Sequence, residues 1–242
     1  MNGFSLNGKN SRDYGIIMTA PPNVVLPARK VETVTIPGRS GTLTMDSHSY
    51  ENTHIQYKCA IVPEDPVTLR EAAEKAMEIL GSTAEYKRLE NTYTPAYFQM
   101  ARVSSQISIE SIVEQAGTFS IPFDMMPQRY MKAGEFPISM EAAGILLNPT
   151  LFPAKPLITV YGSGAGTVSV GTVNMAIKSN DGHIVFDCDM QDAYHVADSG
   201  ALESRNSCIN VPEFPVLPAG ETVISWTGAI TSVEIIPRWW TL

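Results

Sequence analysis

The chain has 242 residues, with 17 Lys and Arg against 25 Asp and Glu, so its formal net charge is −8. This length can bury a substantial core and suits one large domain or two of ordinary size. The acidic balance argues against a protein whose main task is to grip nucleic acid, because phosphate binding needs a basic face. A hydrophobic content of 44% excludes a disordered chain. No apolar run approaches the ~20 residues of a membrane span.

The charge is divided unevenly along the chain. Residues 1–135 carry 13 basic and 15 acidic side chains, a net charge of −2, whereas residues 136–242 carry 4 and 10, a net charge of −6. This difference suggests two domains. The abundance of Thr, Ser, Gly and Pro, with 17 Gly and 17 Pro, is typical of short strands joined by many turns.

The N-terminus and the cysteines bear on the compartment. The first five residues lack the basic region and following apolar stretch of a secretory signal. Cys59, Cys188 and Cys208 have no regular spacing and leave at least one unpaired, which favours reduced, buried thiols over a disulfide scaffold. We expect the chain to be made and used from a cytoplasm.

One long helix is predicted over about residues 66–80. Asp65 can cap a helix whose first residue is Pro66, and Thr68 with Glu71 offers an alternative capping box. Apolar residues then recur on one face, and Gly81 ends the pattern.

Almost everything else alternates with period two, which indicates half-buried strands in antiparallel sheets. The strand patterns cover residues 54–59, 106–110, 118–124, 167–170 and 183–187. Prolines interrupt the pattern around residues 137–149. We therefore predict a mainly β fold, with an α+β N-terminal domain over residues 1–136, a Pro-marked connection over 137–149, and a C-terminal β-sandwich over 150–242.

Two motifs invite a chemical interpretation and are better explained structurally. The glycine-rich residues 162–166 have the spacing G-x-G-x-G and precede a strand, so a hairpin turn is favoured over a nucleotide loop, which needs G-x-G-x-x-G before a helix. The residues that could be drawn as a metal cluster miss the Gly and Glu positions of a calcium loop, so an acidic turn at a strand end is favoured. They are Asp187, Cys188, Asp189, Asp192 and His195.

The histidines and tryptophans give weaker signals. His48, His54, His183 and His195 are scattered with no nucleophile nearby in sequence, so no catalytic residue is assigned. The adjacent pair Trp239 and Trp240 must point to opposite faces of a strand, so one ring is either exposed or covered by something else.

Taken together and in order, several segments resemble the distal tail protein (Dit) family of siphophages and related prophages. No single segment is specific, but their order and spacing are. They are residues 4–16 with their Asn-Gly turn and Asp-Tyr-Gly, 27–30, 36–41 with Pro-Gly-Arg-Ser-Gly, the helix at about 66–80, the aromatic-rich 93–98, 119–124, 127–130, 148–149, 214–220 and 237–239.

The resemblance implies a structural protein of the virion, assembled in the bacterial host cytoplasm. Such proteins form a homo-hexameric ring at the tail tip, between the tail tube protein above and a tail-associated hub protein below. The resemblance further implies that the N-terminal domain builds the ring around a channel through which DNA passes unbound, and that the C-terminal domain is galectin-like. Receptor-binding proteins dock at the periphery in many phages. It implies no catalytic, metal or cofactor-binding residue and no cofactor.

Three functions follow, with the structural tail-tip hub preferred. A carbohydrate-binding adhesion module would need an exposed aromatic floor, and a hydrolase would need a nucleophile, base and orienting group within hydrogen-bond reach. For the hub, a subunit contact is expected in one loop and the strands after it. The loop residues are Ile36, Pro37, Gly38, Arg39, Ser40 and Gly41.

Overall fold

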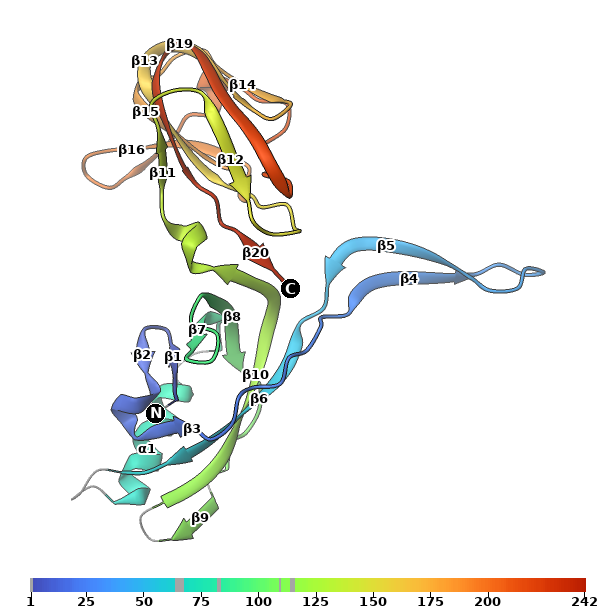
Figure 1. Ribbon diagram of the computed structural model, residues 1–242, viewed down its shortest axis with the longest axis vertical. Helices are drawn as coiled ribbons and strands as arrows, with labels where there is room; N and C mark the ends of the chain where they lie inside the picture. Colours follow the sequence, from blue (N-terminus) through green and yellow to red (C-terminus); the bar gives the residue numbers. More distant parts are fainter. Residues whose placement is uncertain (1, 64–67, 82–83, 109, 114–115) are drawn as a thin grey trace. The chain divides into compact units, whose positions relative to one another are not determined.

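The computed structural model describes residues 1–242 except 1, 64–67, 82–83, 109 and 114–115. The chain forms two compact units, Met1–Arg129 and Tyr130–Thr241 (Figure 1), each with its own hydrophobic core. Most of the described elements are strands in antiparallel sheets, and these elements include one α-helix, so the predicted mainly β fold is confirmed. No helix in the described part of the chain is long and apolar enough to cross a membrane.

The first unit is built on one antiparallel sheet with the strand order β2-β1-β7-β8-β10-β6-β3, and β9 also pairs with β10. Strands β6 and β10 pair without interruption from Gly117 opposite Ile61 to Met125 opposite Thr53. The strands are β1 (Phe4–Leu6), β2 (Lys9–Asn10), β3 (Ile16–Met18), β6 (Thr53–Ile61), β7 (Lys87–Asn91), β8 (Tyr97–Val103), β9 (Glu110–Val113) and β10 (Ala116–Met131), with a 3₁₀ turn at Ser11–Tyr14.

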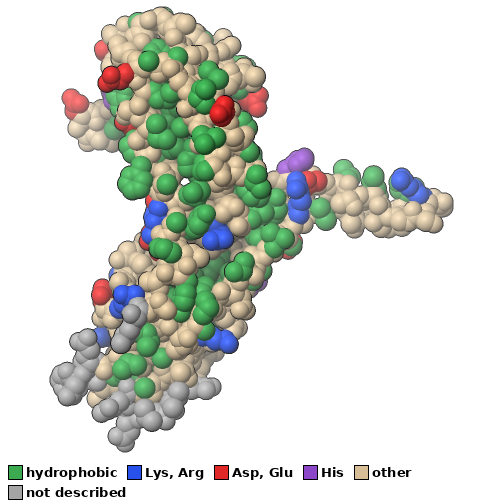
Figure 2. Space-filling model, in the orientation of Figure 1, with side chains coloured by type: hydrophobic (Ala, Val, Ile, Leu, Met, Phe, Trp, Pro, Cys, Tyr) green, Lys and Arg blue, Asp and Glu red, His purple; other side chains and the backbone are tan. Residues whose placement is uncertain are grey.

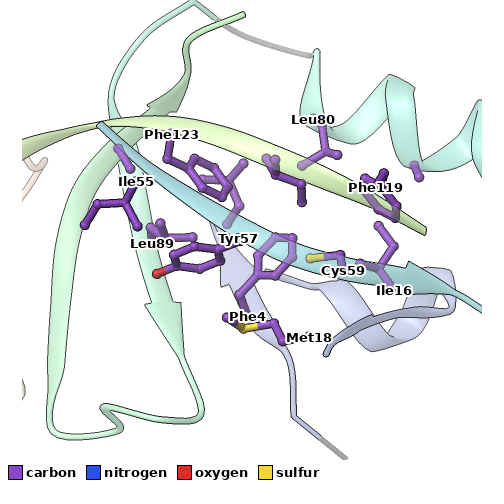
Figure 3. Close-up of a cluster of buried hydrophobic side chains, with 14 of the residues drawn as sticks. Phe4, Ile16, Met18, Ile55, Tyr57, Cys59, Leu80, Leu89, Phe119 and Phe123 are labelled. Atoms are coloured by element: carbon purple, nitrogen blue, oxygen red, sulfur yellow. The ribbon is translucent and has the colours of Figure 1, made fainter. Parts of the chain in front are cut away.

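The core of this unit follows from the alternation in β6. Every second residue of β6 is buried, including Tyr57. The Tyr57 ring packs edge-on against Phe4 and Phe123, with ring centroids 5.9 and 5.0 Å apart (Figure 3). Such edge-to-face contacts add to the hydrophobic gain from burying the rings. The strand predicted over residues 54–59 is thereby confirmed.

Helix α1 (Leu69–Leu80) covers this core with its small side chains. The capping box of Thr68 and Glu71 forms: the Thr68 hydroxyl accepts from the Glu71 N–H at 3.3 Å, and the Glu71 carboxylate accepts from the Thr68 N–H at 3.0 Å. Ala72, Ala76 and Leu80 are buried against the sheet. The other expected start, Asp65 and Pro66, lies outside the described residues.

The strand predicted over residues 106–110 is wrong for its described part. Residues 104–108 form no strand, and β9 begins at Glu110. The N–H and hydroxyl of Ser104 both donate to the carbonyl of Pro122, at 2.9 and 3.1 Å. Because Pro122 has no N–H to return, the ladder cannot continue past this point.

The second unit is a two-layered β structure made from one sheet that folds over itself. Strands β13 and β19 pair along most of their length, and each of them runs from one layer into the other. The first half of β13 pairs with β15 and the second half with β14. The strands are β11 (Ile138–Met140), β12 (Gly144–Asn148), β13 (Leu157–Val170), β14 (Val173–Ile177), β15 (Asp181–Asp187), β16 (Asp192–Val196), β17 (Leu202–Ser204), β18 (Ile209–Asn210) and β19 (Gly220–Ile236), with 3₁₀ turns at Lys132–Glu135 and Asn206–Cys208. The short β20 (Trp240–Thr241) is not part of this sheet and pairs with β10.

The glycine-rich residues 162–166 are the bend between these layers, so the hairpin turn predicted there is wrong. They lie inside β13, where its register with β19 shifts at Gly162 and again before Gly166. A Cβ on Gly162 would come within 2.3 Å of the Ala229 carbonyl oxygen. Glycine is needed because the two strands approach too closely for any side chain. Val160 and Val168, on either side of the bend, are both fully buried between the layers.

The Pro-rich stretch expected to connect the domains contains two strands of the second unit. Both β11 and β12 pair with β19. Within the apolar run of β12, Leu146 packs into the core while Ile145 and Leu147 point outward and are each 61% exposed. The predicted domain limits at 136 and 150 stay predictions.

The three cysteines are free thiols. Cys59 and Cys188 are buried, and burial raises the pKa of each thiol to about 12. Cys208 is only partly buried, and hydrogen bonds from Ser179 and Ser207 lower the pKa of its thiol. The three thiols therefore differ in reactivity, because the thiolate is the reactive form.

We expect a thiol titration of the native protein to modify Cys208 alone. In denaturant all three thiols should react, since burial is what protects the other two. A Cys208→Ser variant should show no fast phase in the native state. Rapid native-state modification of Cys59, located by mass spectrometry, would contradict the described core.

Candidate assembly interface

Strands β4 (Arg29–Thr35) and β5 (Thr42–Tyr50) form a separate two-stranded sheet, here called the arm. Every residue of β4 and each residue of β5 from Thr42 to His48 is exposed, and Figure 1 shows the arm as a long hairpin. A two-stranded hairpin is marginally stable in water unless it packs against something. The arm is therefore the part of the first unit that most needs a partner.

The tip of the arm is formed by the loop predicted as a subunit contact. Ile36, Pro37, Gly38 and Arg39 make a tight turn closed by the Arg39 N–H to the Ile36 carbonyl at 3.2 Å. Gly38 has φ +81°, the value that a type II turn requires after proline. The whole loop, through Ser40 and Gly41, is exposed. The structure thus brings these six residues together at one end of the hairpin.

The two faces of the arm differ in chemistry. Val34 lies opposite Leu43, and Met45 lies two residues further along the same face. These side chains are 39%, 46% and 53% exposed, and hydrophobic side chains are visible along the arm in Figure 2. Glu32 lies opposite Met45 on this face, and the other face carries Thr33 opposite Thr44 and Thr35 opposite Thr42. Around Val34 and Leu43 the arm therefore has an apolar face, which is open to solvent.

A polar contact links the two strands of the arm at its base. Arg29 forms an ion pair with Asp46 and lies over the Tyr50 ring, 5.6 Å from its centroid. Asp46 also accepts from the His48 N–H at 2.9 Å. The Arg29 guanidinium and this N–H hold the pKa of Asp46 below its ordinary value. These contacts lie where the register shifts after Arg29, so they fix the twist of the hairpin at its base.

A second polar cluster holds the chain just after the arm. Asp124 of β10 is 5% exposed and accepts hydrogen bonds from Asn52 at 3.0 Å, Tyr86 at 2.6 Å and Arg102 at 3.0 Å. Burial by itself would raise the pKa of Asp124, but these three donors together hold it below its ordinary value. Because Asn52 is the second residue after β5, this buried carboxylate anchors the end of the arm to the sheet.

The acidic turn that could be drawn as a metal cluster is satisfied by protein groups. Asp187 accepts both guanidinium nitrogens of Arg238, at 2.7 and 3.0 Å, and the N–H groups of Asp189 and Met190. The Arg238 guanidinium lowers the pKa of Asp187. In the part of the chain that the structure describes, no three His, Cys, Asp or Glu side chains are grouped to hold a metal ion.

The structure does bring together two of the scattered histidines. The His183 and His195 rings lie 4.2 Å apart, and Nδ1 of His195 is 2.9 Å from the His183 carbonyl oxygen. Burial and the neighbouring His195 lower the pKa of His183. The contact joins two strands, and the residues described around it form no nucleophile–base pair.

An open hollow of about 490 Å³ lies over β6 and β10 in the first unit. Its lining is mainly hydroxyl and amide side chains, with Lys58 as its charged group. Among the lining residues that the structure describes, there is no His, Asp or Glu that would activate a serine hydroxyl. A hydrolase site is not supported here.

The tryptophan pair behaves as the strand alternation predicts. Trp239 is buried, whereas Trp240 is turned away from it. The Trp240 ring stacks on Phe152 with centroids 4.6 Å apart, and its N–H donates to the Pro153 carbonyl at 2.9 Å. The second ring is therefore covered by its own unit.

The sequence matches a known protein family, and the fold is similar to those of solved phage proteins. Residues 9–125, which include the arm, match the family model described as the phage tail protein RIFT-related domain. The fold is similar to that of the SPP1 Dit (gp 19.1) protein, described as a paradigm of hub adsorption apparatus in phages that infect Gram-positive bacteria. The TM-score is 0.72 at 11% identity, covering 100% of both chains.

Two further solved structures are similar. A chain of the phage p2 baseplate in its activated conformation with Sr has a TM-score of 0.51 at 8% identity, covering 97% of this chain and 98% of that one. The same baseplate with Ca gives 0.50 at 8% identity, covering 97% of each chain. No curated protein matches the sequence.

Residues 9–125 thus form a domain of a phage tail family, and the whole chain has the same fold as the SPP1 Dit protein. The resemblance to siphophage distal tail proteins is confirmed. Together the findings support a structural component of a phage tail or baseplate.

The sequence pattern predicted the loop at residues 36–41 but not the apolar face of the arm, the Arg29–Asp46 contact or the Asp124 cluster. The alternation of Val34 with Ile36 and of Leu43 with Met45 was a usable signal for the face. The Asp124 cluster had no local signal, because its members are far apart in the sequence.

We expect Tyr86→Phe to lower the free energy of unfolding by about 1–2 kcal/mol at neutral pH, since it removes one donor from a buried carboxylate. A carboxylate with a depressed pKa stabilises the fold above its ordinary value of 3.8 and loses that effect as the pH falls. The difference between variant and wild type should therefore shrink on acidification.

Urea denaturation at several pH values measures this difference. Tyr97→Phe is the matched control, because the Tyr97 ring lies under Arg129 and keeps that contact without its hydroxyl. Equal losses in both variants, independent of pH, would exclude the proposed anchoring by Asp124.

Proposed function

We propose that this chain is a non-catalytic distal tail protein of a long-tailed phage or prophage. It forms a homo-hexameric ring that joins the tail tube to the tail-tip apparatus. The proposal is supported by the tail domain over residues 9–125 and by the likeness to a hub protein and to baseplate chains. Adsorption is stated for the SPP1 protein, and by this likeness it is proposed here.

The observation that carries the ring is the arm. A closed ring needs a heterologous contact, in which one surface of each copy meets a different surface of the next. A projecting hairpin with an open apolar face suits such a contact, since it can lie on the neighbouring copy and remove Val34, Leu43 and Met45 from water. The Ile36–Gly41 loop then contacts the neighbour at the end of the hairpin.

The burial of these side chains gives each contact a favourable hydrophobic contribution. Fully burying a large aliphatic side chain is worth about 1.5–3 kcal/mol. Because Val34 and Leu43 are already partly shielded, at 39% and 46% exposure, burying what remains of both contributes about 1–3 kcal/mol at each contact, or about ten- to a hundredfold in association. Because a closed hexamer contains the contact six times, weakening it at each position lowers the stability of the whole ring six times over.

Charge supports the remaining arrangement. Residues 130–241 carry 5 basic and 11 acidic side chains, a net charge of −6, which suits a solvated periphery where receptor-binding proteins dock. The ring's channel passes DNA without binding it, so its wall is neutral or acidic. The proposed partners are the tail tube protein above and a tail-associated hub protein below. The proposed location is the tail tip of the virion, after assembly in the bacterial cytoplasm.

We expect the double variant Val34→Lys/Leu43→Lys to stay folded and to lose the hexamer, because two charges replace the apolar contact. Thr33→Lys/Thr44→Lys is the matched control, with the same added charge on the opposite face of the same strands. Light scattering after size-exclusion chromatography, over a range of concentrations, gives the masses. Loss of the hexamer in the control alone would contradict the assignment of the apolar face.

Assembly is expected to reside in the first unit. A fragment of residues 1–129 should form rings, and a fragment of residues 130–242 should remain monomeric, because like charges repel most strongly at low salt. The cut falls at 129 because β11 and β12 pair with β19. Hexamers of the second fragment beside a monomeric, folded first fragment would refute this.

A further inference from the structure

Strand β12 is an edge strand of the second unit. It pairs with β19 from Gly144 opposite Ile224 to Asn148 opposite Gly220. Within residues 130–241, all of which the structure describes, β12 has no other strand partner. Its second row of backbone N–H and C=O groups is therefore available to another chain.

This edge lacks the devices that usually protect one. Edge strands are normally guarded by charged side chains, proline or a bulge. The five residues of β12 are Gly, Ile, Leu, Leu and Asn, and their register with β19 is continuous. Pro149 comes only after the strand ends. An unprotected apolar edge of this kind favours pairing with a further strand.

The outward side chains of the edge are apolar and exposed. Ile145 and Leu147 are each 61% exposed, and Val223, directly opposite Ile145 on β19, is 56% exposed. Leu151, just past the end of β12, is 88% exposed. We call Ile145, Leu147 and Val223 the edge patch.

The apolar character is confined to this edge. Further across the same sheet, Ser225 of β19 lies opposite Ser169 of β13. The Ser169 hydroxyl in turn hydrogen-bonds Asn174 of β14 at 2.7 Å. A partner that covered the whole face would meet these polar groups, whereas a single strand added beside β12 would lie next to the exposed Ile145 and Leu147. The pattern therefore fits strand addition rather than flat packing.

The surroundings of the edge patch are acidic. Glu221 lies directly opposite Leu147, and Glu141 precedes β12 by three residues; both are exposed. The unit as a whole carries the net charge of −6 given above. A second copy of this surface would bring like charges together, whereas a segment with Lys or Arg would complement them.

The edge is also held rigidly. The Asn148 amide donates to the carbonyls of Phe152 at 2.9 Å and Leu217 at 3.0 Å, and its oxygen accepts from the N–H and hydroxyl of Thr150. Leu146 is buried on the inner face. Because the strand is already ordered, little conformational entropy is lost when a partner pairs with it.

We propose that β12 is a docking edge for an extended segment of another protein, which adds as a strand and carries apolar residues at alternate positions and Lys or Arg beside them. The apolar residues cover the edge patch, and a basic side chain meets Glu221. That the segment belongs to another tail component rests on the proposed function, but the docking edge itself does not depend on ring formation.

The test uses the full-length chain and three short capped peptides. The first alternates Val with Lys and Thr. The second has Glu in place of Lys, and the third repeats the first with alternate backbone amides N-methylated, which blocks strand pairing on one edge. Hydrogen exchange at Ile145 and Leu147 and fluorescence anisotropy report the position and the affinity.

The Lys peptide should slow exchange in β12 and bind at least tenfold more tightly than either of the others. Leu147→Lys should weaken its binding at least tenfold. The matched control is Leu202→Lys, which places the same charge on a 68% exposed leucine of β17 and should leave binding unchanged.

Other outcomes overturn the proposal. Equal binding of the N-methylated peptide excludes strand addition, and equal binding of the Glu peptide excludes the charge argument. If no peptide binds, no extended segment of this chemistry occupies the edge. If β12 becomes protected only as the protein concentration rises, and Leu147→Lys abolishes this protection, the occupant is a second copy of this chain. The hexamer measurement on arm variants is independent, so failure here and failure of the ring are distinguishable.

Discussion

In a chain built almost entirely of strands, apolar sheet faces and open strand edges must be covered, and this constraint shapes the whole protein. Within each unit the chain satisfies it internally. Helix α1 covers the sheet of the first unit, and the second unit folds one sheet over itself so that its apolar faces meet. In the arm and in β12, by contrast, apolar side chains remain exposed to solvent. In the proposed ring and the proposed added strand, another polypeptide covers them.

At the base of the arm, polar contacts stabilise the arrangement of the strands, whereas elsewhere a hydrophobic core does so. The arm has no second layer, so packing cannot set its direction. Two ionised carboxylates act here: Asp46 links the two strands of the arm to each other, and Asp124 accepts a hydrogen bond from Asn52, the second residue after β5. Such contacts are directional, and they leave both faces of the hairpin unobstructed. The apolar face of the arm therefore stays exposed and available for contact with another chain.

Glycines in the second unit show how tertiary structure changes the meaning of a motif. A run of alternating glycines before a strand is compatible with a turn, and sequence alone favours one. In the structure the run lies where β13 crosses from one layer to the other against β19, and the close backbone approach at Gly162 excludes any side chain. Deep burial of Val160 and Val168 on opposite sides of the bend depends on this crossing. The requirement comes from a strand more than sixty residues away, as the pairing of Gly162 with Ile230 shows.

The sequence by itself determined the mainly β fold, the single long helix with the Thr68 capping box as one of two possible starts, the core-facing residues of β6 and the loop at residues 36–41. Each of these depends on residues close together in the chain, through alternation, capping or turn chemistry. Only the tertiary structure decided that residues 162–166 are a bend, that Ile145 and Leu147 face solvent, and that Asp124 anchors the arm. Those outcomes depend on which distant strands become neighbours, and a local pattern of apolar and polar residues is the same whether its partner is the core, another copy or water.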